Sequence, residues 1–362
     1  MHEQGLRQLN FVEAIREGLD LALAQDPSVL VIGEGVTDPK AIFTSTAGLQ
    51  QKYGPQRVFD MPLAENGLTG VCIGAAISGM RPVMIHQRIE FAMLAMDQIV
   101  NNAAKWHYIF NGKARVPLVI RMIVGRGWGQ GPQHSQSLQA MFASVPGLKV
   151  VMPTTAADAK GLMIVAIEDD NPVVFIEHRW LHHVTDNVPE GVYRIPIGQA
   201  RVMHEGSDAT IAAFSYMSLE SMLTAKALKK YMGISVDLID MRSVRPLDLP
   251  AVLNSVEKTG RLVVADTAFK IGSVAGELVS QVVEQAFDCL KKAPVRIASP
   301  DHPVPTSPFM AAECYPGPQQ IAEAVIDLVG ASRDTLGYQA LCEALVRRNR
   351  HDVPSRDFLG PF

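Results

Sequence analysis

The stretch of residues 58–86, VFDMPLAENGLTGVCIGAAISGMRPVMIH, places the tightest limits on what this chain can fold into. A short apolar strand over residues 58–61 runs into Pro62, and a lone carboxylate, Glu65, follows. A helix rich in glycine, alanine and serine comes next, and a second strand covers residues 82–85. Each glycine inside a helix costs about 1 kcal/mol relative to alanine. We therefore expect another backbone or a flat cofactor to approach this helix closely.

Helices and buried strands alternate along the chain on both sides of this stretch. The continuous apolar run 29–32 indicates a strand that is buried on both faces, as in a parallel sheet, and residues 117–124 are expected to form another buried strand. Asn10 and Glu13 have the spacing of a capping box at the start of a helix. Residues 91–110 are expected to form one long helix. This order predicts an α/β fold made of doubly wound, mostly parallel sheets between helices.

The chain is too long, at 362 residues, for one hydrophobic core of ordinary size. We expect a first domain over residues 1–185, a linker over 186–207, a second domain over 208–330 and a tail over 331–362. The linker lies in a stretch, 180–207, whose prolines predict irregular structure. A helix is expected in the tail, before the basic residues Arg347, Arg348 and Arg350.

The composition excludes several classes of partner. A net charge of −4 gives no reason to expect nucleic acid or an anionic membrane surface. No apolar run reaches the ~18 residues of a membrane span, and the N-terminal residues lack the apolar core of a signal peptide. The four cysteines are widely spaced, which fits a reducing compartment: Cys72, Cys289, Cys314 and Cys342. We expect a cytoplasmic protein.

Two residues are candidates for proton transfer. The run 125–136, GRGWGQGPQHSQ, has glycine at every second position at its start, so it is predicted to be a loop that delivers His134 to the start of the next helix. The usual phosphate-loop, serine-hydrolase and zinc-protease motifs are absent from the sequence. Glu65 and His134 each follow a strand closely, and a carboxylate with an imidazole suits acid–base chemistry. Alternatively, Glu65 is a solvated turn residue or helix cap, and His134 an ordinary exposed side chain.

Several motifs resemble one family. They are RVFDMPLAE (57–65), GMRP (79–82), AMDQI (95–99), NAAK (102–105), QHSQ (133–136), VPGLKVV (145–151), DAKG (158–161), DNPVV (170–174) and MRSVRPL (241–247). Together they resemble the beta subunit of the thiamine diphosphate-dependent decarboxylating component of 2-oxo acid dehydrogenase complexes, of the pyruvate and branched-chain type. The resemblance implies the transketolase-like superfamily: a transketolase pyrimidine-binding domain followed by a transketolase C-terminal domain.

The resemblance also implies roles for single residues. Glu65 matches the glutamate that bonds a ring nitrogen of the cofactor's aminopyrimidine and stabilises its imino tautomer. Phe91 matches the aromatic residue that packs on the aminopyrimidine face. His134 matches the histidine that faces the substrate and handles protons. A structural potassium site of some relatives matches four backbone positions: Leu118, Ala166, Asp169 and Asn171.

One family motif is missing from the chain. The family binds the diphosphate and magnesium through a Gly-Asp-Gly motif on an alpha subunit, and no Gly-Asp-Gly occurs here. The resemblance therefore implies half a site, which is completed by an alpha subunit in an assembly of two alpha and two beta chains. The glycine-rich helix fits a close contact between paired subunits, and the second domain is expected to join two beta subunits. A lipoyl acyltransferase is a further expected partner.

Three residues depart from the family pattern near the expected substrate mouth. Arg88 lies in HQRIE (86–90), and Arg126 and Trp128 lie in MIVGRGWGQGP (122–132). These residues either repack the subunit interface or bind a second anionic or polyhydroxylated group, since a guanidinium grips carboxylate or phosphate bidentately. The second alternative implies a substrate larger than pyruvate.

The sequence is compatible with three functions. The leading one is a beta subunit that decarboxylates a 2-oxo acid and passes the acyl group to a lipoyl arm. The alternative is a split transketolase or carboligase subunit, in which the same carbanion attacks an aldehyde. The third, a non-catalytic scaffold, is disfavoured because Glu65, Phe91 and His134 are all present.

Overall fold

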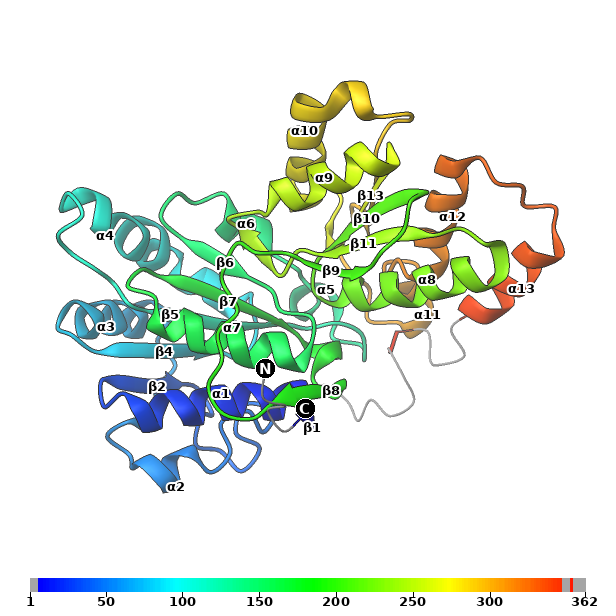
Figure 1. The fold of residues 1–362 in the computed structure, drawn as a ribbon. Coiled ribbons are helices and arrows are strands. Elements are labelled where there is room, and N and C mark those ends of the chain that lie inside the picture. Colours follow the sequence, from blue (N-terminus) through cyan, green and yellow to red (C-terminus); the bar gives the residue numbers. More distant parts are fainter. Residues whose placement is uncertain (1–5, 347–351, 354–362) are drawn as a thin grey trace. The chain divides into compact units, whose positions relative to one another are not determined.

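The structure, a computed structural model, describes residues 6–346 and 352–353 (Figure 1). The basic residues Arg347, Arg348 and Arg350 lie outside this range. The chain divides into two compact units. The first holds the described residues up to 126 together with 141–197, and the second holds 127–140 and the described residues from 198 onward. The glycine-rich loop therefore belongs to the second unit, although it is flanked in sequence by the first.

The first unit is built on six parallel strands in the order β6-β7-β5-β4-β2-β3. They are β2 (Val29–Gly33), β3 (Val58–Asp60), β4 (Arg81–His86), β5 (Val119–Val124), β6 (Lys149–Val151) and β7 (Val173–His178). Every residue of β5 and β7 is buried, and β5 confirms the buried strand that was expected over 117–124. A separate antiparallel pair joins β1 (Leu6–Asn10) to β8 (Thr185–Pro189).

Two helices of this unit begin where the sequence predicted them. The capping box of Asn10 and Glu13 is present at the start of α1 (Phe11–Gln25), which packs against α7 (Ala156–Glu168). Glu65 is the first residue of α3 (Glu65–Ile77). The remaining helices are α2 (Leu49–Tyr53), α4 (Ala104–Ile109), α6 (Gln139–Ala143) at the border of the units, and the 3₁₀ turn η3 (Arg179–Leu181).

The second unit is a five-stranded sheet in the order β14-β13-β10-β11-β9, with β9 antiparallel. Its strands are β9 (Arg201–His204), β10 (Ala209–Ala213), β11 (Val236–Asp240), β13 (Leu262–Phe269) and β14 (Val295–Ser299), with the short β12 (Ser243–Arg245). Its helices are α5 (Gly131–His134), α8 (Tyr216–Met232), α9 (Leu249–Thr259), α10 (Val274–Ala286), η4 (Phe287–Cys289), α11 (Pro308–Ala312), α12 (Pro318–Val329) and α13 (Leu336–Leu345). Ile211, Leu228 and Val325 lie in its apolar core.

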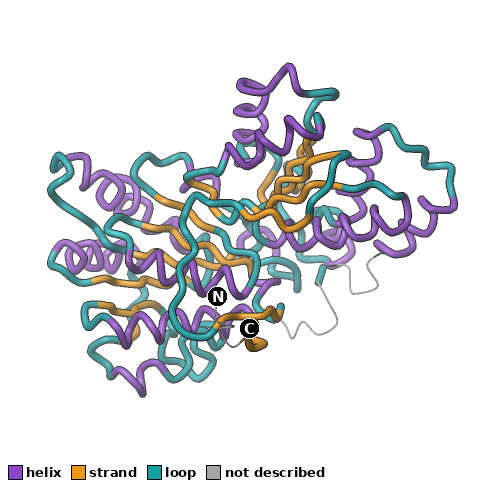
Figure 2. The backbone as a smooth tube through the Cα atoms, viewed as in Figure 1, coloured by secondary structure: helices purple, strands orange, loops and turns teal. Residues whose placement is uncertain are grey.

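The α/β fold class is confirmed, since each unit has parallel strands joined by helices (Figure 2). Two predictions of local structure are wrong. Residues 91–110 do not form one helix: they split into a 3₁₀ segment η1 (Phe91–Ala95), a π segment η2 (Gln98–Ala103) and α4. The stretch 180–207 is not irregular throughout, because it contains β8 and β9.

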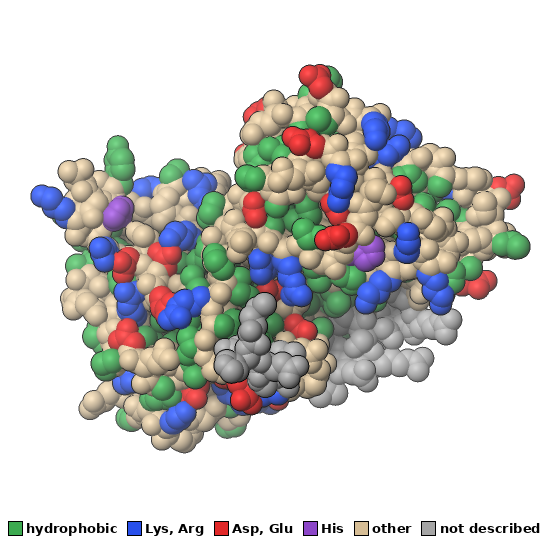
Figure 3. Space-filling model, viewed as in Figure 1, with side chains coloured by type: hydrophobic (Ala, Val, Ile, Leu, Met, Phe, Trp, Pro, Cys, Tyr) green, Lys and Arg blue, Asp and Glu red, His purple; other side chains and the backbone are tan. Residues whose placement is uncertain are grey.

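A membrane span requires a helix of sufficient length and apolarity. Within the described residues, no helix has the length and apolarity to cross a bilayer. Positive and negative side chains are interspersed over the face drawn in Figure 3. All four cysteines lie in the described part of the chain and are free thiols.

Candidate active site

Charged side chains gather at the carboxyl edge of the first unit's sheet. The six strands are parallel, and neighbouring strands end at nearly the same level. The residues that follow the strands therefore lie at one edge of the sheet, and α/β sheets bind ligands at this edge. Along this edge Glu65 follows β3, Glu34 follows β2, Arg88 follows β4, Arg126 follows β5 and Arg179 follows β7. Acidic residues therefore occupy one part of the edge and arginines the other.

Two carboxylates make up the acidic part. Glu65 is 6% exposed and opens α3, where the helix dipole favours a negative charge. Burial, and then the charge of Glu65, raise the pKa of Glu34 above its usual value. One oxygen of Glu34, Oε1, is buried and has no hydrogen-bond partner among the described residues. This part of the site can accept a hydrogen bond from a ligand's N–H group.

Phe91 begins the 3₁₀ segment η1, directly after the turn that carries Arg88. Its N–H donates to the Arg88 carbonyl at 3.2 Å, which closes that turn. The π segment η2 follows, and single-turn π segments are frequent at functional sites. Phe91 and Arg88 thus share one short, non-α-helical segment at the sheet edge.

His134 and Trp128 belong to the second unit, whereas Glu65, Phe91, Arg88 and Arg126 belong to the first. His134 ends the single-turn helix α5 and does not start the following helix, so that detail of the prediction is wrong. Trp128 has a φ of 57° and is 37% exposed. The residues on either side of Trp128 fix the loop by hydrogen bonds: Gly127 N–H donates to the Tyr315 hydroxyl at 3.0 Å, and Gly129 N–H donates to Asp352 Oδ2 at 3.1 Å.

Three buried arginines with aromatic partners make up the basic part of the edge. The Arg88 and Arg179 guanidinium carbons lie 5.0 and 4.5 Å from the ring centroid of Phe43. The Arg126 guanidinium lies 4.9 Å from the ring centroid of Trp180, whose Nε1–H donates to the Arg126 carbonyl at 2.7 Å. Arg88 is 6% exposed and Arg179 is 3% exposed. Sequence reasoning missed Phe43, Arg179 and Trp180, although HRWLHH directly after a buried strand was a visible basic and aromatic cluster.

Phe43 sits on a strained turn. Residues 41–44 all have positive φ angles, from 40° to 71°, and none of them is glycine. A left-handed conformation costs about 1–2 kcal/mol for each such residue. Thr46 Oγ1 holds the turn through bonds to the carbonyls of Val36 (2.8 Å) and Ala41 (3.0 Å). Strained backbone that is held in place by surrounding contacts is typical of functional sites.

A fully buried ion pair anchors this turn to the sheet. Arg121, in β5, binds both carboxylate oxygens of Glu177, in β7, and neither side chain is exposed. Arg121 Nη2 also donates to Ser45 Oγ at 2.7 Å. His182 Nε2 lies 3.2 Å from the second Glu177 oxygen. Burial raises the pKa of Glu177, but Arg121 and His182 outweigh that effect and hold it below its usual value.

The histidines around the edge are uncharged near neutral pH. Burial lowers the pKa of His86 and of His182 to about 4 in each case. Burial, then the charge of Arg126, lower the pKa of His178 well below its usual value. The positive charge at this part of the site therefore belongs to the arginines.

The backbone predicted to hold potassium lies near Arg81. Its guanidinium donates to the carbonyls of Ile167 and Asp169, both at 3.0 Å, while the Leu118 carbonyl accepts from Val173 N–H at 2.9 Å. Each carbonyl keeps a second lone pair, so a cation would share these oxygens with existing donors. No group of three or more His, Cys, Asp or Glu side chains in the described residues is arranged to hold a metal ion.

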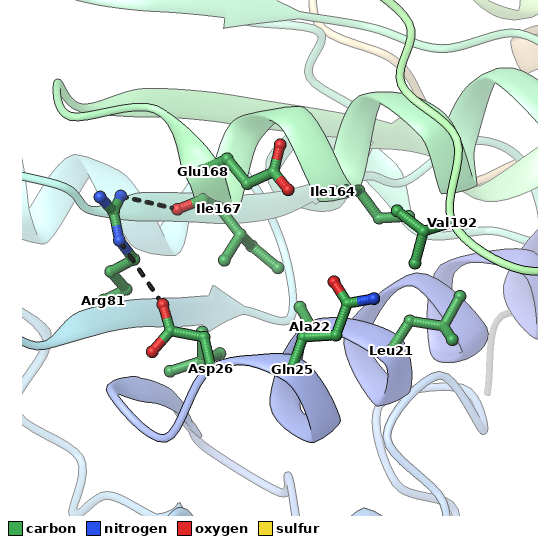
Figure 4. Close-up of a pocket in the computed structure, with 10 residues that line it drawn as sticks. Leu21, Ala22, Gln25, Asp26, Arg81, Ile164, Ile167, Glu168 and Val192 are labelled. Atoms are coloured by element: carbon green, nitrogen blue, oxygen red, sulfur yellow. Dashed lines mark hydrogen bonds and ion pairs between the residues drawn. The ribbon is translucent and has the colours of Figure 1, made fainter.

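A cavity of about 220 Å³ lies beside Arg81 in the first unit. Figure 4 shows Arg81 bonded to the Ile167 carbonyl and paired with Asp26, with apolar side chains of α1 and α7 on either side. Arg81 is the first residue of β4, so this cavity lies at the amino end of the strands. It is therefore separate from the charged edge.

Comparison with known proteins assigns the family. Residues 7–183 match the transketolase pyrimidine-binding domain, and residues 198–321 match the transketolase C-terminal domain. The chain is 41% identical over 328 residues to the beta subunit of acetoin:2,6-dichlorophenolindophenol oxidoreductase of Cupriavidus necator, covering 88% of this chain and 96% of that protein. The chain belongs to this beta-subunit family.

A second relative is the beta subunit of the pyruvate dehydrogenase E1 component of Rickettsia felis, which is 39% identical over 319 residues. That match covers 88% of this chain and 97% of the relative. A solved structure described as a split-gene transketolase, inactive beta4 tetramer, matches with a TM-score of 0.72 over 88% of this chain and 97% of its own. At 23% identity, that likeness shows the fold alone.

The family depends on thiamine diphosphate, and the acidic part of the edge in this beta-family chain fits the pyrimidine half of that cofactor. A buried carboxylate, Glu65, can accept from a ring N–H, and Glu34 offers a further buried oxygen with no described partner. Phe91 supplies an aromatic side chain close to the same edge. These residues could hold the cofactor's aminopyrimidine.

Proposed function

We propose that this chain is the beta half of a thiamine diphosphate-dependent enzyme that decarboxylates a 2-oxo acid and transfers the acyl group to a lipoyl acceptor. The observation that carries the proposal is Glu65, a buried carboxylate at the carboxyl edge of the pyrimidine-binding unit. The relatives' names support the choice, since several are beta subunits of pyruvate dehydrogenase that the chain spans almost entirely.

The proposed roles follow the chemistry of each side chain. When bound, the cofactor provides the carbon nucleophile that no amino-acid side chain offers. Glu65 accepts a hydrogen bond from the ring N–H and holds the tautomer needed for proton removal, while Phe91 packs on the ring. His134 gives or takes protons on the substrate. Arg88, Arg126 and Trp128 contact the part of the substrate away from the reacting carbonyl.

A second candidate is the cleavage of a hydroxyketone such as acetoin. Two relatives, at 41% and 38% identity, are named beta subunits of acetoin:2,6-dichlorophenolindophenol oxidoreductase. The same residues would serve, because both reactions need the activated cofactor. The split-transketolase alternative rests on likeness of fold.

The test is a turnover assay on the chain co-expressed with its alpha subunit, with thiamine diphosphate and magnesium. A panel of 2-oxo acids, acetoin and ketose phosphates is offered with lipoamide, with ferricyanide or with an aldehyde. We expect 2-oxo acids to be decarboxylated with lipoamide or ferricyanide as acceptor. Turnover of acetoin alone would favour the second candidate. Product formed only with an aldehyde would overturn both.

The partners of this chain are part of the proposal. An alpha subunit supplies the magnesium and diphosphate ligands, a second beta subunit completes the assembly, and a lipoyl acyltransferase accepts the product. Potassium at the backbone of Leu118, Ala166, Asp169 and Asn171 is a further proposed ligand. We place the enzyme in the cytoplasm, which suits its free thiols.

The glycines of α3 support a subunit contact. A Cβ added at Gly67 or Gly74 meets no described atom within 4 Å outside the helix's own backbone, and Val71 beside them is 60% exposed. A close packing contact that requires glycine at these two positions would therefore be made with atoms outside the described residues of this chain. We propose that α3 packs against another subunit.

Gly74→Leu is expected to weaken assembly without unfolding the chain. Leucine improves helix propensity by roughly 1 kcal/mol, but it overpacks a close subunit contact by about 1–3 kcal/mol. Light scattering after gel filtration should show the assembly dissociating at concentrations about tenfold higher than for the natural chain. Ser280→Leu, on the exposed face of α10, is the matched control. Equal assembly of the two variants would contradict the proposed contact.

A further inference from the structure

The glycine-rich loop of the second unit has an unusual backbone conformation. Gly127, Trp128 and Gly129 have successive positive φ angles of 72°, 57° and 67°, although Trp128 is not a glycine. A residue with a side chain rarely adopts such an angle unless surrounding contacts hold it there. The loop carries Trp128 and leads into α5, whose last residue is His134. The contacts that fix this loop therefore bear on two residues of the proposed site.

The transketolase C-terminal domain supplies two of these contacts. The Tyr315 hydroxyl accepts a hydrogen bond from Gly127 N–H at 3.0 Å. A β-carbon added at Gly131 would lie 2.7 Å from Thr306 Cγ2, so the loop packs closely on Thr306. Both Thr306 and Tyr315 lie inside the matched range 198–321. These two contacts therefore come from the domain that assigns the chain to its family.

A third contact comes from the tail. Gly129 N–H donates to Asp352 Oδ2 at 3.1 Å. Asp352 is 2% exposed and Val353 is 5% exposed, so this part of the tail is buried. The loop and Asp352 belong to the same unit. The matched domains cover residues 7–183 and 198–321, so the tail adds a contact that neither domain contains.

The bond to Asp352 is made where it can control the loop. Gly129 follows Trp128 directly and lies two residues before α5 begins. A carboxylate accepts a hydrogen bond from a backbone N–H more strongly than a neutral acceptor does. Because left-handed residues persist only while their surroundings hold them, loss of this acceptor should let the loop sample other conformations.

We propose that Asp352 is a positioning residue, which holds the glycine-rich loop so that Trp128 and His134 are presented to the substrate. The proposal rests on the proposed function, since it names a residue that acts through the same site. Asp352 acts through the backbone of Gly129, and its carboxylate takes no part in the chemistry. The tail is thereby a working part of the enzyme, although it lies beyond both matched domains.

The first test measures turnover of the assembled alpha–beta enzyme with the full-length chain. Asp352→Ala removes the acceptor, and we expect kcat to fall about tenfold, the effect of one lost hydrogen bond to a carboxylate. Affinity for thiamine diphosphate should not change, because Glu65 and Phe91 belong to the first unit. Asp352→Asn keeps an oxygen that can accept from Gly129 N–H, so it should retain about a third or more of the natural kcat. Asp334→Ala removes an exposed carboxylate of the same tail and is the matched control.

A double variant shows whether Asp352 acts through the loop. His134→Ala alone is expected to lower kcat strongly. Adding Asp352→Ala to it should lower kcat by a further factor of about two or less, because the effects of residues that act as a unit do not add. An additional loss of about tenfold in the double variant would overturn the proposal. So would Asp352→Ala with the kcat of Asp334→Ala, or Asp352→Asn as damaging as Asp352→Ala.

Hydrogen exchange keeps the inference separate from the proposed function, because it needs no turnover. Exchange of the backbone amides of residues 127–134 is followed by mass spectrometry, and urea unfolding checks the fold. We expect these amides to exchange about tenfold faster in Asp352→Ala than in Asp334→Ala, at an unchanged urea midpoint.

The two readouts fail independently. If no substrate is turned over but the exchange differs as expected, the proposed function fails and the hold of Asp352 on the loop stands. If 2-oxo acids are turned over but the loop exchanges equally in both variants, the positioning role fails and the function stands. Faster exchange with an unchanged kcat would also overturn the positioning role.

Discussion

Glu65→Gln is expected to lower turnover of the alpha–beta enzyme by about 10²- to 10⁴-fold, the range typical of a lost acid–base group. Glutamine keeps the size of the side chain and its place at the start of α3, but it removes the negative charge. A neutral amide no longer favours the protonated ring nitrogen, so the tautomer that activates the cofactor becomes less populated. The measurement is kcat with saturating thiamine diphosphate, together with cofactor affinity by calorimetry.

Glu34→Gln is the matched control for this prediction. Glu34 also opens onto the carboxyl edge, but its pKa is raised by burial and by Glu65, so it gives up its proton less readily. Replacing it should reduce kcat by about tenfold or less, a small part of the full acid–base effect. If Glu34→Gln proved more damaging than Glu65→Gln, the roles assigned to the two carboxylates would have to be exchanged.

The alternation of strands and helices was predictable because strands that are buried on both faces consist mostly of apolar residues. The strands expected over residues 29–32, 82–85 and 117–124 correspond to β2, β4 and β5. Parallel strands then bring the residues that follow them to one edge. Glu65 could therefore be assigned to that edge from the sequence alone, whereas Arg88 and Arg126 were expected near the substrate only through the family resemblance.

The prediction of one long helix over 91–110 was wrong because α, 3₁₀ and π turns repeat at similar intervals. Apolar residues at three- and four-residue spacing suit all three, so the pattern alone cannot tell η1 and η2 from α-helix. The placement of His134 was also wrong, because the end of the glycine-rich loop forms a single-turn helix, Gly131–His134, of which His134 is the last residue.

The left-handed turn could not have been predicted. Alanine, isoleucine, phenylalanine and threonine are poor candidates for positive φ, and neither glycine nor asparagine occurs among residues 41–44. The turn is held by the bonds of Thr46 to the Val36 and Ala41 carbonyls and by the distant Arg121, which donates to the adjacent Ser45. The sequence around Phe43 therefore did not predict its conformation. Without the position of Phe43, the sequence could not show that Arg179 and Arg88 lie against the same ring.

Glu177→Gln is expected to destabilise the protein by about 3–5 kcal/mol, because it leaves the Arg121 charge buried without a counter-charge. The side chain keeps its shape, so the loss is electrostatic and no cavity is created. Urea unfolding should show a lower midpoint with an unchanged slope. Arg194→Gln, which breaks an exposed pair with Glu168, should change the midpoint little.

A double variant separates the stability of this ion pair from its role at the site. Arg121→Met with Glu177→Leu replaces both charges by apolar groups of similar volume, and such replacements are often neutral or stabilising. We expect the double variant to unfold at nearly the natural urea midpoint. It nevertheless removes the donor to Ser45, so the turn that carries Phe43 loses its anchor and kcat/KM of the assembled alpha–beta enzyme should fall. A double variant that is stable and equally active would show that the pair serves the fold alone, whereas a stable but much less active one would show that Arg121 and Glu177 also position the turn of Phe43 for the reaction.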